Sequence, residues 1–298
     1  MKMNAIQLKW LIRIILKDLK IGVKEHIVLE AYHPDATNLY NFTSSLEEVC
    51  EKLNDPKKRI NEIMIQLFQP CYPMLGEKAK PNKIETLLKN QSFYIETKYD
   101  GERFQLHKSN DKYGYYSRNS HDYSDTFGRD SSNGSLTPYI HYAFSKDVKS
   151  IILDGEMCGY NSSENILLTS KGEYDVKSNS RHWDNIHTCY VVFDILMFND
   201  QVLTNKPLKE RLEYLKKAFT EIEDRIIVSN RELCTSNQQV VDALNRAIDN
   251  RLEGIVVKDP SSVYQPNVRS SSGWFKVKPD YMLGLNDDLG KLILNYML

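Results

Sequence analysis

The chain has few cysteines, and they are not arranged as a metal site or a secreted disulfide scaffold would have them. Its 298 residues include five cysteines, and no two of these form a C-x-x-C pair. An odd number also fits poorly with the disulfide framework of a secreted domain. The seven histidines show no metal-ligand spacing. We therefore expect an intracellular protein in a reducing compartment.

A long hydrophobic run and an excess of one charge are absent as well. Lys9, Arg13, Lys17 and Lys20 interrupt the apolar N-terminal stretch, which therefore predicts neither a membrane span nor a good signal peptide. The formal net charge of −1 excludes a polycation, so any nucleic-acid surface must be a local patch. There is no repeat and no low-complexity segment. The composition, 41% hydrophobic and 27% charged, is that of a soluble globular protein with a sizeable core.

The first 70 residues carry helical signals and no strand signals. Residues 5–20 have apolar and basic positions at helical spacing. Ser45 and Glu48 form a capping-box pattern that opens a second short helix, which ends near Pro56. Residues 57–68 predict a third helix. A purely structural helical cap is one interpretation of this region, and a role in DNA binding is the other.

Strands dominate from Phe93 onward. Pro70, Pro73 and Pro81 mark the connection before them, which we take as the domain boundary. Several short strands with interspersed helices predict an α+β fold rather than regular β-α alternation. The predicted strands are 93–99, 102–107, 112–118, 150–157, 188–198, 254–258 and 274–278, and the predicted helices between them are 207–219 and 238–250.

The most informative stretch is residues 93–107. Aromatic and β-branched residues flank Asp100-Gly101, which predicts a hairpin with a two-residue turn. In that hairpin Lys98 lies opposite Arg103, and the two cations repel unless an anion such as phosphate lies between them. The neighbouring charge also favours the neutral amine of Lys98, which makes it a candidate nucleophile. An ordinary hairpin with solvated charges is the alternative.

Two apolar strands contain side chains that a simple core would not need. Asp154 and Glu156 interrupt a buried-type strand, and alternation places both on one face. A hard cation bound to phosphates needs only one or two such carboxylates, although solvated acids at a strand end are the alternative. Phe193 lies in a central-type strand, where an aromatic residue is usually part of the core.

Two later strands combine apolar residues with lysines. Glu253 and Lys258 flank a β-branched strand that begins with Gly254, and both can reach one ligand only if the glycine bends the chain. The final strand places Lys276 and Lys278 on one face. Because adjacent like charges repel, this pair also indicates a bound anion.

These residues fall into known motifs. Lys98-Tyr99-Asp100-Gly101 resembles the K-x-D-G signature of nucleotidyltransferases, in which the lysine carries AMP or GMP as a phosphoramidate. Residues 96–103 are similar to the ATP-dependent DNA ligases, and residues 93–103 resemble their eukaryotic ligase IV branch. Five motifs in the expected order are far more specific than one. The other four are D-G-E at 154–156, F-D-x-x-x-x-N at 193–199, E-G-h-h-h-K at 253–258, where h is apolar, and W-x-K-x-K at 274–278.

A further motif departs from the family pattern. Residues 117–120 resemble S-R-N-G, but Ser120 replaces the glycine. If the turn needs a positive φ, the serine is strained there.

The resemblance implies a role for each motif residue. Lys98 is the implied catalytic nucleophile, which attacks ATP and forms lysyl-AMP. The resemblance implies that Glu96 and Phe193 hold adenine and that Arg103 and Glu156 hold the ribose. It implies ATP and Mg²⁺ as cofactors, with Glu156 and Glu253 as metal ligands. The complete implied nucleotide-binding set is Glu96, Thr97, Tyr99, Arg103, Glu156, Lys171, Phe193, Glu253, Lys258, Lys276 and Lys278.

The resemblance also implies a domain organisation. It covers about residues 5–290, of which 1–75 are the expected C-terminal part of a helical DNA-binding domain. Residues 76–290 are the expected adenylation domain, with two antiparallel sheets around the nucleotide. An OB-fold domain follows in such ligases, whereas residues 291–298 end this sequence, so we expect a truncated tail. The repeats that bind the scaffold protein of ligase IV are also expected to be absent.

The implied function is that of a ligase IV-type enzyme. Such an enzyme joins nicked or broken double-stranded DNA through lysyl-AMP, in non-homologous end joining and DNA recombination in the nucleus. A truncated remnant that binds nucleotide or DNA without ligase turnover is the alternative, and an assay of ATP-dependent nick sealing separates the two. An RNA ligase or capping enzyme shares K-x-D-G but does not explain the helical N-terminus. Any DNA binding is expected to be weak and salt-sensitive, through Arg13, Lys17, Lys20 and Arg118.

Overall fold

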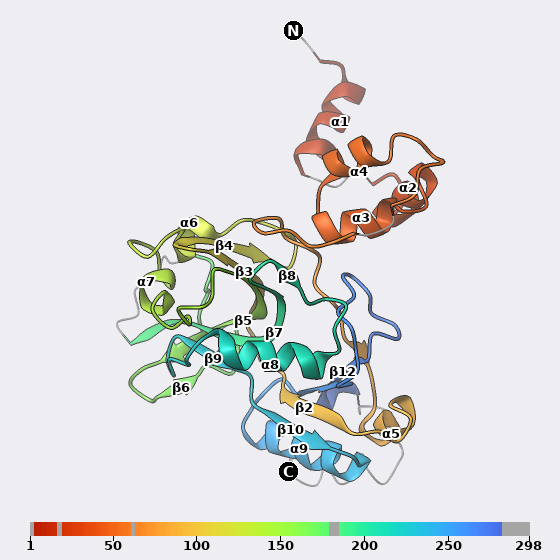
Figure 1. The fold of residues 1–298 in the computed structure, drawn as a ribbon. Coiled ribbons are helices and arrows are strands. Elements are labelled where there is room, and N and C mark those ends of the chain that lie inside the picture. The colour runs from red at the N-terminus through yellow and green to blue at the C-terminus, as the bar shows by residue number, and fades with distance from the viewer. Residues whose placement is uncertain (1–2, 17–19, 61–62, 179–184, 282–298) are drawn as a thin grey trace. The chain divides into compact units, whose positions relative to one another are not determined.

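A computed structural model describes residues 3–16, 20–60, 63–178 and 185–281 (Figure 1). The chain divides into two compact units, Met1–Ile63 and Met64–Leu298. The last part of the expected adenylation domain, 282–290, and the expected tail, 291–298, lie outside the described residues, as does Lys17.

The described part of the first unit is helical, as predicted. Ser45 caps the fourth helix, because its side chain accepts a hydrogen bond from the Glu48 N–H at 3.2 Å. A small apolar core holds three of the helices together, whereas the first helix contributes no buried residue. The core residues are Leu29, Ala36, Leu39, Val49 and Leu53. The helices are α1 (Ala5–Ile15), α2 (Glu25–Tyr32), α3 (Ala36–Thr43) and α4 (Leu46–Lys52).

The helix predicted at 57–68 is wrong: residues 57–60 and 63–68, the described part of this range, are not helical. Side chains bind the backbone groups that a helix would have paired internally. The Phe68 N–H donates to His107 Nδ1 at 2.9 Å, and Tyr116 Oη donates to the Phe68 carbonyl at 3.0 Å. These bonds tie the start of the second unit to its larger sheet.

Long-range strand pairing builds the larger sheet of the second unit. Among the described residues its order is β4-β3-β5-β7-β8, with β6 paired to β5 and β9 paired to β7. Helix α8 (Leu208–Ala218) packs on β7 through Leu212 and Leu215 (Figure 1). The strands are β3 (Glu102–Ser109), β4 (Lys112–Ser117), β5 (Ser150–Asn161), β6 (Ile166–Leu167), β7 (Ile186–Phe198), β8 (Gln201–Val202) and β9 (Ile226–Val228), and short helices α6 (Ser124–Phe127) and α7 (Thr137–Ile140) lie between β4 and β5 in the chain.

The smaller sheet has the order β1-β12-β11-β2-β10 in the described chain. Helix α9 (Asn237–Asp249) covers it (Figure 1) and begins with a capping box between Ser236 and Gln239. Its Val240 and Leu244 join the core under the sheet, where each large apolar side chain contributes about 1.5–3 kcal/mol. The strands are β1 (Glu77–Lys78), β2 (Phe93–Thr97), β10 (Arg231–Cys234), β11 (Ile255–Lys258) and β12 (Trp274–Val277), and the remaining short helices are η1 (Pro81–Lys83), α5 (Ile84–Leu87) and η2 (Pro279–Tyr281).

The predicted α+β class is confirmed, but the sheets are mixed rather than antiparallel. Strand β1 runs parallel to β12, and β9 runs parallel to β7. Each of these two strands is separated from its parallel partner in the chain by at least one helix, so no tight hairpin turn joins them. All other strand pairs among the described residues are antiparallel.

The hairpin predicted around Asp100-Gly101 is wrong. Strand β2 pairs with β10 and β11, whereas β3 pairs with β4 and β5, so Lys98 does not lie opposite Arg103. Gly101 is needed because the chain passes close to β5 at this point, not because it forms a hairpin turn. A Cβ on Gly101 would overlap the carbonyl oxygen of Met157 on β5, so only glycine lets the chain cross there from one sheet to the other.

Two further features agree with the composition. All five cysteines are free, and all but Cys50 are buried. None of the helices in the described ranges has both the length and the apolar character that crossing a bilayer requires.

The contact between the Phe68 N–H and His107 predicts how stability depends on pH. Burial lowers the pKa of His107 to about 3, from an ordinary value of 6.5. The unfolded chain therefore binds a proton between these values that the folded chain excludes. Stability should be fully present above pH 6.5 and be lost as the pH falls towards 3, by up to about 1.4 kcal/mol per pH unit from this group.

The measurement is the free energy of unfolding in urea from pH 4.5 to 8. His107→Asn keeps an acceptor near the Phe68 amide and should flatten the acid side of the profile. His141→Asn removes an exposed histidine and serves as the matched control. An unchanged slope in His107→Asn would show that another group causes the acid sensitivity.

Candidate active site

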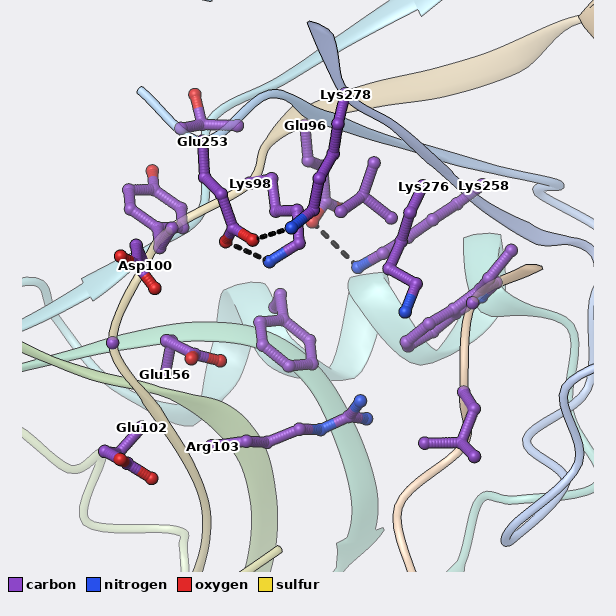
Figure 2. A pocket seen from close by; sticks show the side chains of 18 of the residues that line it. Glu96, Lys98, Asp100, Glu102, Arg103, Glu156, Glu253, Lys258, Lys276 and Lys278 are labelled. Atoms are coloured by element: carbon purple, nitrogen blue, oxygen red, sulfur yellow. Dashed lines mark hydrogen bonds and ion pairs between the residues drawn. The ribbon is translucent and has the colours of Figure 1, made fainter. Parts of the chain in front are cut away.

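A cavity of about 370 Å³ lies where the two sheets of the second unit meet. All the residues that the sequence singled out for nucleotide chemistry line it, although they come from both sheets and from the segments between them. Figure 2 is a close-up of the cavity in which most of these side chains with charged groups are labelled. The predicted residues in its lining are Glu96, Thr97, Lys98, Tyr99, Arg103, Glu156, Lys171, Phe193, Glu253, Lys258, Lys276 and Lys278.

Glu253 is the centre of the charge arrangement on the smaller sheet. One of its carboxylate oxygens contacts Lys98 Nζ and the other contacts Lys278 Nζ (Figure 2). The two lysines hold the pKa of this carboxyl below its ordinary value, although partial burial acts to raise it. Gly254 follows with φ of +139°, which is the bend that brings Glu253 into the same cavity as Lys258.

Glu96 is a second anion within this group of lysines, and it is almost fully buried. It accepts from Lys258 Nζ at 2.7 Å and from Arg231 Nε at 3.1 Å. Burial lowers the pKa of Lys258, and Glu96 opposes that change. Glu96 therefore presents a carboxylate, held by two basic side chains, within the cavity lining.

Phe193 reaches the cavity because β7 is irregular. Asp154 on β5 is paired with Asp194, but the next residue, Gly155, is paired with Val192. Phe193 is therefore the extra residue of a β-bulge, which re-aims a side chain that regular alternation would place differently. Lys258 Nζ lies 4.6 Å from the centre of its ring.

Arg103 supports the aromatic ring from the larger sheet. Its guanidinium lies 5.1 Å from the Phe193 ring centre and makes a bidentate pair with the fully buried Asp154, at 3.0 and 2.6 Å. Burial acts to lower the pKa of Arg103, but Asp154, Tyr264 and Glu156 together raise it. The third partner is the Met74 carbonyl, at 2.7 Å.

The cavity carries an excess of positive charge on one side. Burial and four neighbouring cations lower the pKa of Lys276 to about 8. On the other wall, burial raises the pKa of Glu156 to about 7, although Arg103 and Lys98 act against it. Without a bound anion, the ammonium form of Lys276 is therefore less favourable than that of a lysine in water. The cations that surround it are Arg269, Lys98, Arg118 and Lys278.

Three loop residues that the sequence singled out are Lys171, Arg118 and Ser120. Lys171 and Arg118 both line the cavity, and Lys171 also lines a second cavity that shares Asp100, Gly101 and Glu102 with the first. Ser120 has φ of 60°, so the turn does require the left-handed conformation that glycine would adopt freely.

Sequence reasoning missed several partners in the site. Asp154 was taken with Glu156 as a metal candidate, but it binds Arg103 and does not line the cavity. Arg231, which holds Glu96, lies outside every motif. Trp274 was noted only as a motif position, yet its ring lies 4.3 Å from Lys258 Nζ, and its indole N–H is buried without a partner in the described part of the chain.

The carboxylates fit a cation that is shared with phosphates. No group of three or more His, Cys, Asp or Glu side chains within the described ranges could hold a metal by itself. A magnesium ion bound mainly through phosphates needs only one or two protein carboxylates. Glu253 and Glu156 line the same cavity and meet that requirement.

Comparison with known families is decisive. Residues 73–278 match the family described as "ATP dependent DNA ligase domain", and residues 1–33 match "DNA ligase N terminus". The chain belongs to the ATP-dependent DNA ligases. The predicted family is thereby confirmed, and the cavity lies within the segment that matches the ligase domain.

Several curated ligases are similar over almost the whole chain. DNA ligase 4 of Gallus gallus and that of Homo sapiens are each 46% identical over 291 residues, which is 98% of this chain and 32% of each relative. DNA ligase 4 of Coprinopsis cinerea is 38% identical over 297 residues, 98% of this chain and 29% of that protein. The chain thus spans about a third of the length of the curated relatives it matches.

Solved ligase structures share the fold. A mycobacterial DNA ligase D complexed with ATP superposes with a TM-score of 0.51 at 21% identity, over 70% of this chain and 60% of that one. The structure named Pmar-Lig_Pre gives a TM-score of 0.54 at 17% identity, over 91% of this chain and 55% of that one. At such identities the likeness concerns the fold alone.

The lowered pKa of Lys276 predicts pH-dependent binding of phosphate groups. Below pH 8 Lys276 is an ammonium ion that attracts phosphate, and above pH 8 the free site loses this charge. The affinity for a non-hydrolysable ATP analogue should therefore fall between pH 7 and 9.5. Lys276→Arg should flatten the profile, because a guanidinium stays protonated throughout this range.

Isothermal titration calorimetry between pH 7 and 9.5 measures the affinity for the ATP analogue. Lys278→Arg is the matched control, because Glu253 raises the pKa of Lys278 and its charge does not change over the same range. Equal profiles for the wild type and Lys276→Arg would mean that Lys276 does not contact the phosphates.

Proposed function

We propose that this chain carries the nucleotidyltransferase centre of a ligase IV-type DNA ligase and that Lys98 is its covalent nucleophile. The observation that carries the proposal is the convergence of five separated motifs on one cavity. In that cavity a lysine lies beside a carboxylate, and further lysines surround the space where a triphosphate would fit. Membership of the ligase family and the similarity to curated DNA ligase 4 proteins support it.

The first step forms a phosphoramidate. Lys98 must lose a proton before it attacks, and the Glu253 carboxylate contacts the Nζ that carries this proton. The nitrogen lone pair attacks the α-phosphorus of ATP and forms a P–N bond. The bond from the α-phosphorus to the bridging oxygen breaks, and pyrophosphate leaves with the electron pair. Lys258, Lys276 and Lys278 offset the charge of the phosphates.

Two further transfers complete ligation. A 5′-phosphate oxygen of the DNA attacks the AMP phosphorus, the P–N bond breaks and Lys98 is released as the amine. The 3′-hydroxyl oxygen of the adjoining strand then attacks the 5′-phosphorus, and AMP leaves. Each transfer begins with an oxygen nucleophile and ends with a leaving group from the same phosphorus.

A magnesium ion, when bound with the nucleotide, would neutralise phosphate charge. Glu253 and Glu156 would hold it. Because both oxygens of Glu253 are engaged by Lys98 and Lys278, the cation and these ammonium groups compete for one carboxylate. Binding of the cation would therefore loosen the ion pair between Glu253 and Lys98.

The proposed setting is the repair of double-strand breaks by non-homologous end joining in the nucleus, with broken or nicked duplex DNA as the substrate. The similarity to vertebrate and fungal DNA ligase 4 supports this setting. Assays of ATP-dependent nick sealing would test the transfers to DNA separately from formation of lysyl-AMP.

Formation of the covalent intermediate is the direct test of Lys98. Incubation with α-labelled ATP and magnesium should give an acid-labile label on the protein, and Lys98→Ala should abolish it. Lys98→Arg should abolish it too, because the guanidinium stays protonated and is a poor nucleophile. Gel autoradiography after acid and base treatment measures the label.

Lys209→Ala, an exposed lysine on α8, is the matched control and should retain full labelling. If the label persists in Lys98→Ala, another residue is the nucleophile.

Base choice gives a second test. Adenine offers an exocyclic amine to a charged acceptor such as Glu96, whereas guanine offers a carbonyl oxygen that Glu96 repels. ATP should therefore compete for the site at least about 100-fold better than GTP, because guanine places a second acceptor against the buried carboxylate. Competition for labelling by unlabelled ATP and GTP measures the ratio.

Glu96→Gln should reduce this discrimination, because an amide can donate to a carbonyl oxygen as well as accept from an amine. Glu232→Gln, an exposed acid on β10, is the control and should leave the ratio unchanged. Equal competition by GTP in the wild type would favour a guanylyltransferase instead.

A further inference from the structure

We propose that Tyr264 is a positioning residue of the nucleotide cavity, which acts by fixing Arg103 and the distance between the two sheets. The inference rests on the proposed function, since it concerns how the same site recognises the ribose of a nucleotide. Tyr264 belongs to the segment between β11 and β12 and lies outside every motif that the sequence analysis used.

The hydroxyl of Tyr264 is placed between three groups. It donates to Asp154 Oδ2 at 2.6 Å and accepts from the Met74 N–H at 3.1 Å. The same Asp154 oxygen accepts from Arg103 Nη2 at 2.6 Å. The Met74 carbonyl in turn accepts from Arg103 Nη1 at 2.7 Å. One hydroxyl therefore holds both partners of the arginine that lines the cavity.

These bonds connect the two sheets. Asp154 lies on β5 of the larger sheet, while Tyr264 lies in the segment that joins two strands of the smaller sheet. The ring is fully buried, with Trp274 edge-on at 6.2 Å and the Arg211 guanidinium 5.8 Å from its centre. The Tyr264–Asp154 bond thus sets how far Lys258 and Lys276 on one wall lie from Phe193 and Arg103 on the other.

The same residues shape the rim of the cavity. Leu75 and Gly76, which follow Met74, are part of the cavity lining. The Leu75 N–H donates to the Val268 carbonyl at 3.0 Å, so this rim is attached to the segment that carries Tyr264. Without the hydroxyl, the Met74 amide loses its acceptor. Asp154 and Met74, the two partners of Arg103, are then no longer bonded to Tyr264, so Arg103 is held less firmly in place.

Arg103 has one donor left for a ligand. Two of its five N–H groups donate to Asp154, one donates to the Met74 carbonyl, and one makes a long contact of 3.5 Å with the Tyr264 hydroxyl. The fifth N–H group, on Nη1, has no partner among the described residues. A guanidinium held by these bonds has a fixed orientation beside Phe193, where the proposed ribose contact needs it.

The test compares Tyr264→Phe with Tyr115→Phe in the full chain. Tyr115 is also a fully buried tyrosine with a bonded hydroxyl, to Thr137 Oγ1 at 2.7 Å, but it does not line the cavity. Both variants keep the ring, so thermal melting should show similar, small losses of stability. The rate at which the labelled nucleotide becomes attached to the lysine of the protein is measured with ATP, 2′-deoxyATP and 3′-deoxyATP as substrates.

The proposal predicts that Tyr264→Phe raises the KM for ATP by about tenfold, with little change in the rate at saturation, because a displaced Arg103 no longer holds the ribose. The preference for ATP over the poorer deoxy substrate should fall by about three- to tenfold. Tyr115→Phe should change neither quantity.

Each outcome decides a different question. If the wild-type chain forms no label, the proposed function fails. If the wild type is labelled and Tyr264→Phe matches Tyr115→Phe in KM and in substrate preference, Tyr264 has only a structural role and the inference fails. If Tyr264→Phe lowers activity equally with all three nucleotides, ribose positioning is also excluded.

Discussion

Two buried carboxylates face each other in the larger sheet, and the cavity depends on how they are neutralised. Asp154 on β5 is the direct register partner of Asp194 on β7, and both are fully buried. Each has its own bidentate arginine, Arg103 for Asp154 and Arg211 for Asp194. Removal of either arginine would leave an uncompensated buried charge, which typically costs about 3–5 kcal/mol. Phe193 adjoins Asp194 in the bulge, so the position of the aromatic ring depends on the same two charge pairs.

The opposite wall is balanced in another way. Lysines from β11, β12 and the segment after β2 would repel one another, and in the described part of the chain Glu96 and Glu253 are the carboxylates paired with them. No carboxylate of the described residues pairs with Lys276, and burial together with the neighbouring cations lowers its pKa. The wall is therefore electrostatically incomplete without a ligand. Phosphate groups would supply the missing negative charge and would release Glu253 from its two lysines.

Local patterns in the sequence predicted the strands β2, β3, β4, β5, β7, β11 and β12 and the helices α1, α4, α8 and α9, but not the short strands β1, β6, β8, β9 and β10 or the other α-helices. The motifs identified the residues that converge on the cavity. The prediction was wrong where long-range pairing decided the outcome. Asp100-Gly101 has the local signature of a hairpin, but its neighbours find partners more than a hundred residues away in one case and about fifty in the other. Tyr264 and Arg231 act only through such distant partners, so no periodicity or spacing marks them. Residues 57–68 have a helical pattern, yet His107 and Tyr116 bind the backbone of Phe68.

The close passage of Gly101 over β5 has a mechanical consequence. The chain passes between the two sheets at residues 98–101, after β2, and again at 229–230, before β10, and these two strands are paired neighbours. Both of these crossings lie at one side of the smaller sheet, whereas the segment from Met74, whose carbonyl binds Arg103, to β1 crosses at its other edge. Lys98 lies in the first crossing, and Lys276 lies on β12 directly beside β1. The two sheets are therefore held together on both sides of these lysines, and no single edge of the smaller sheet serves as a hinge.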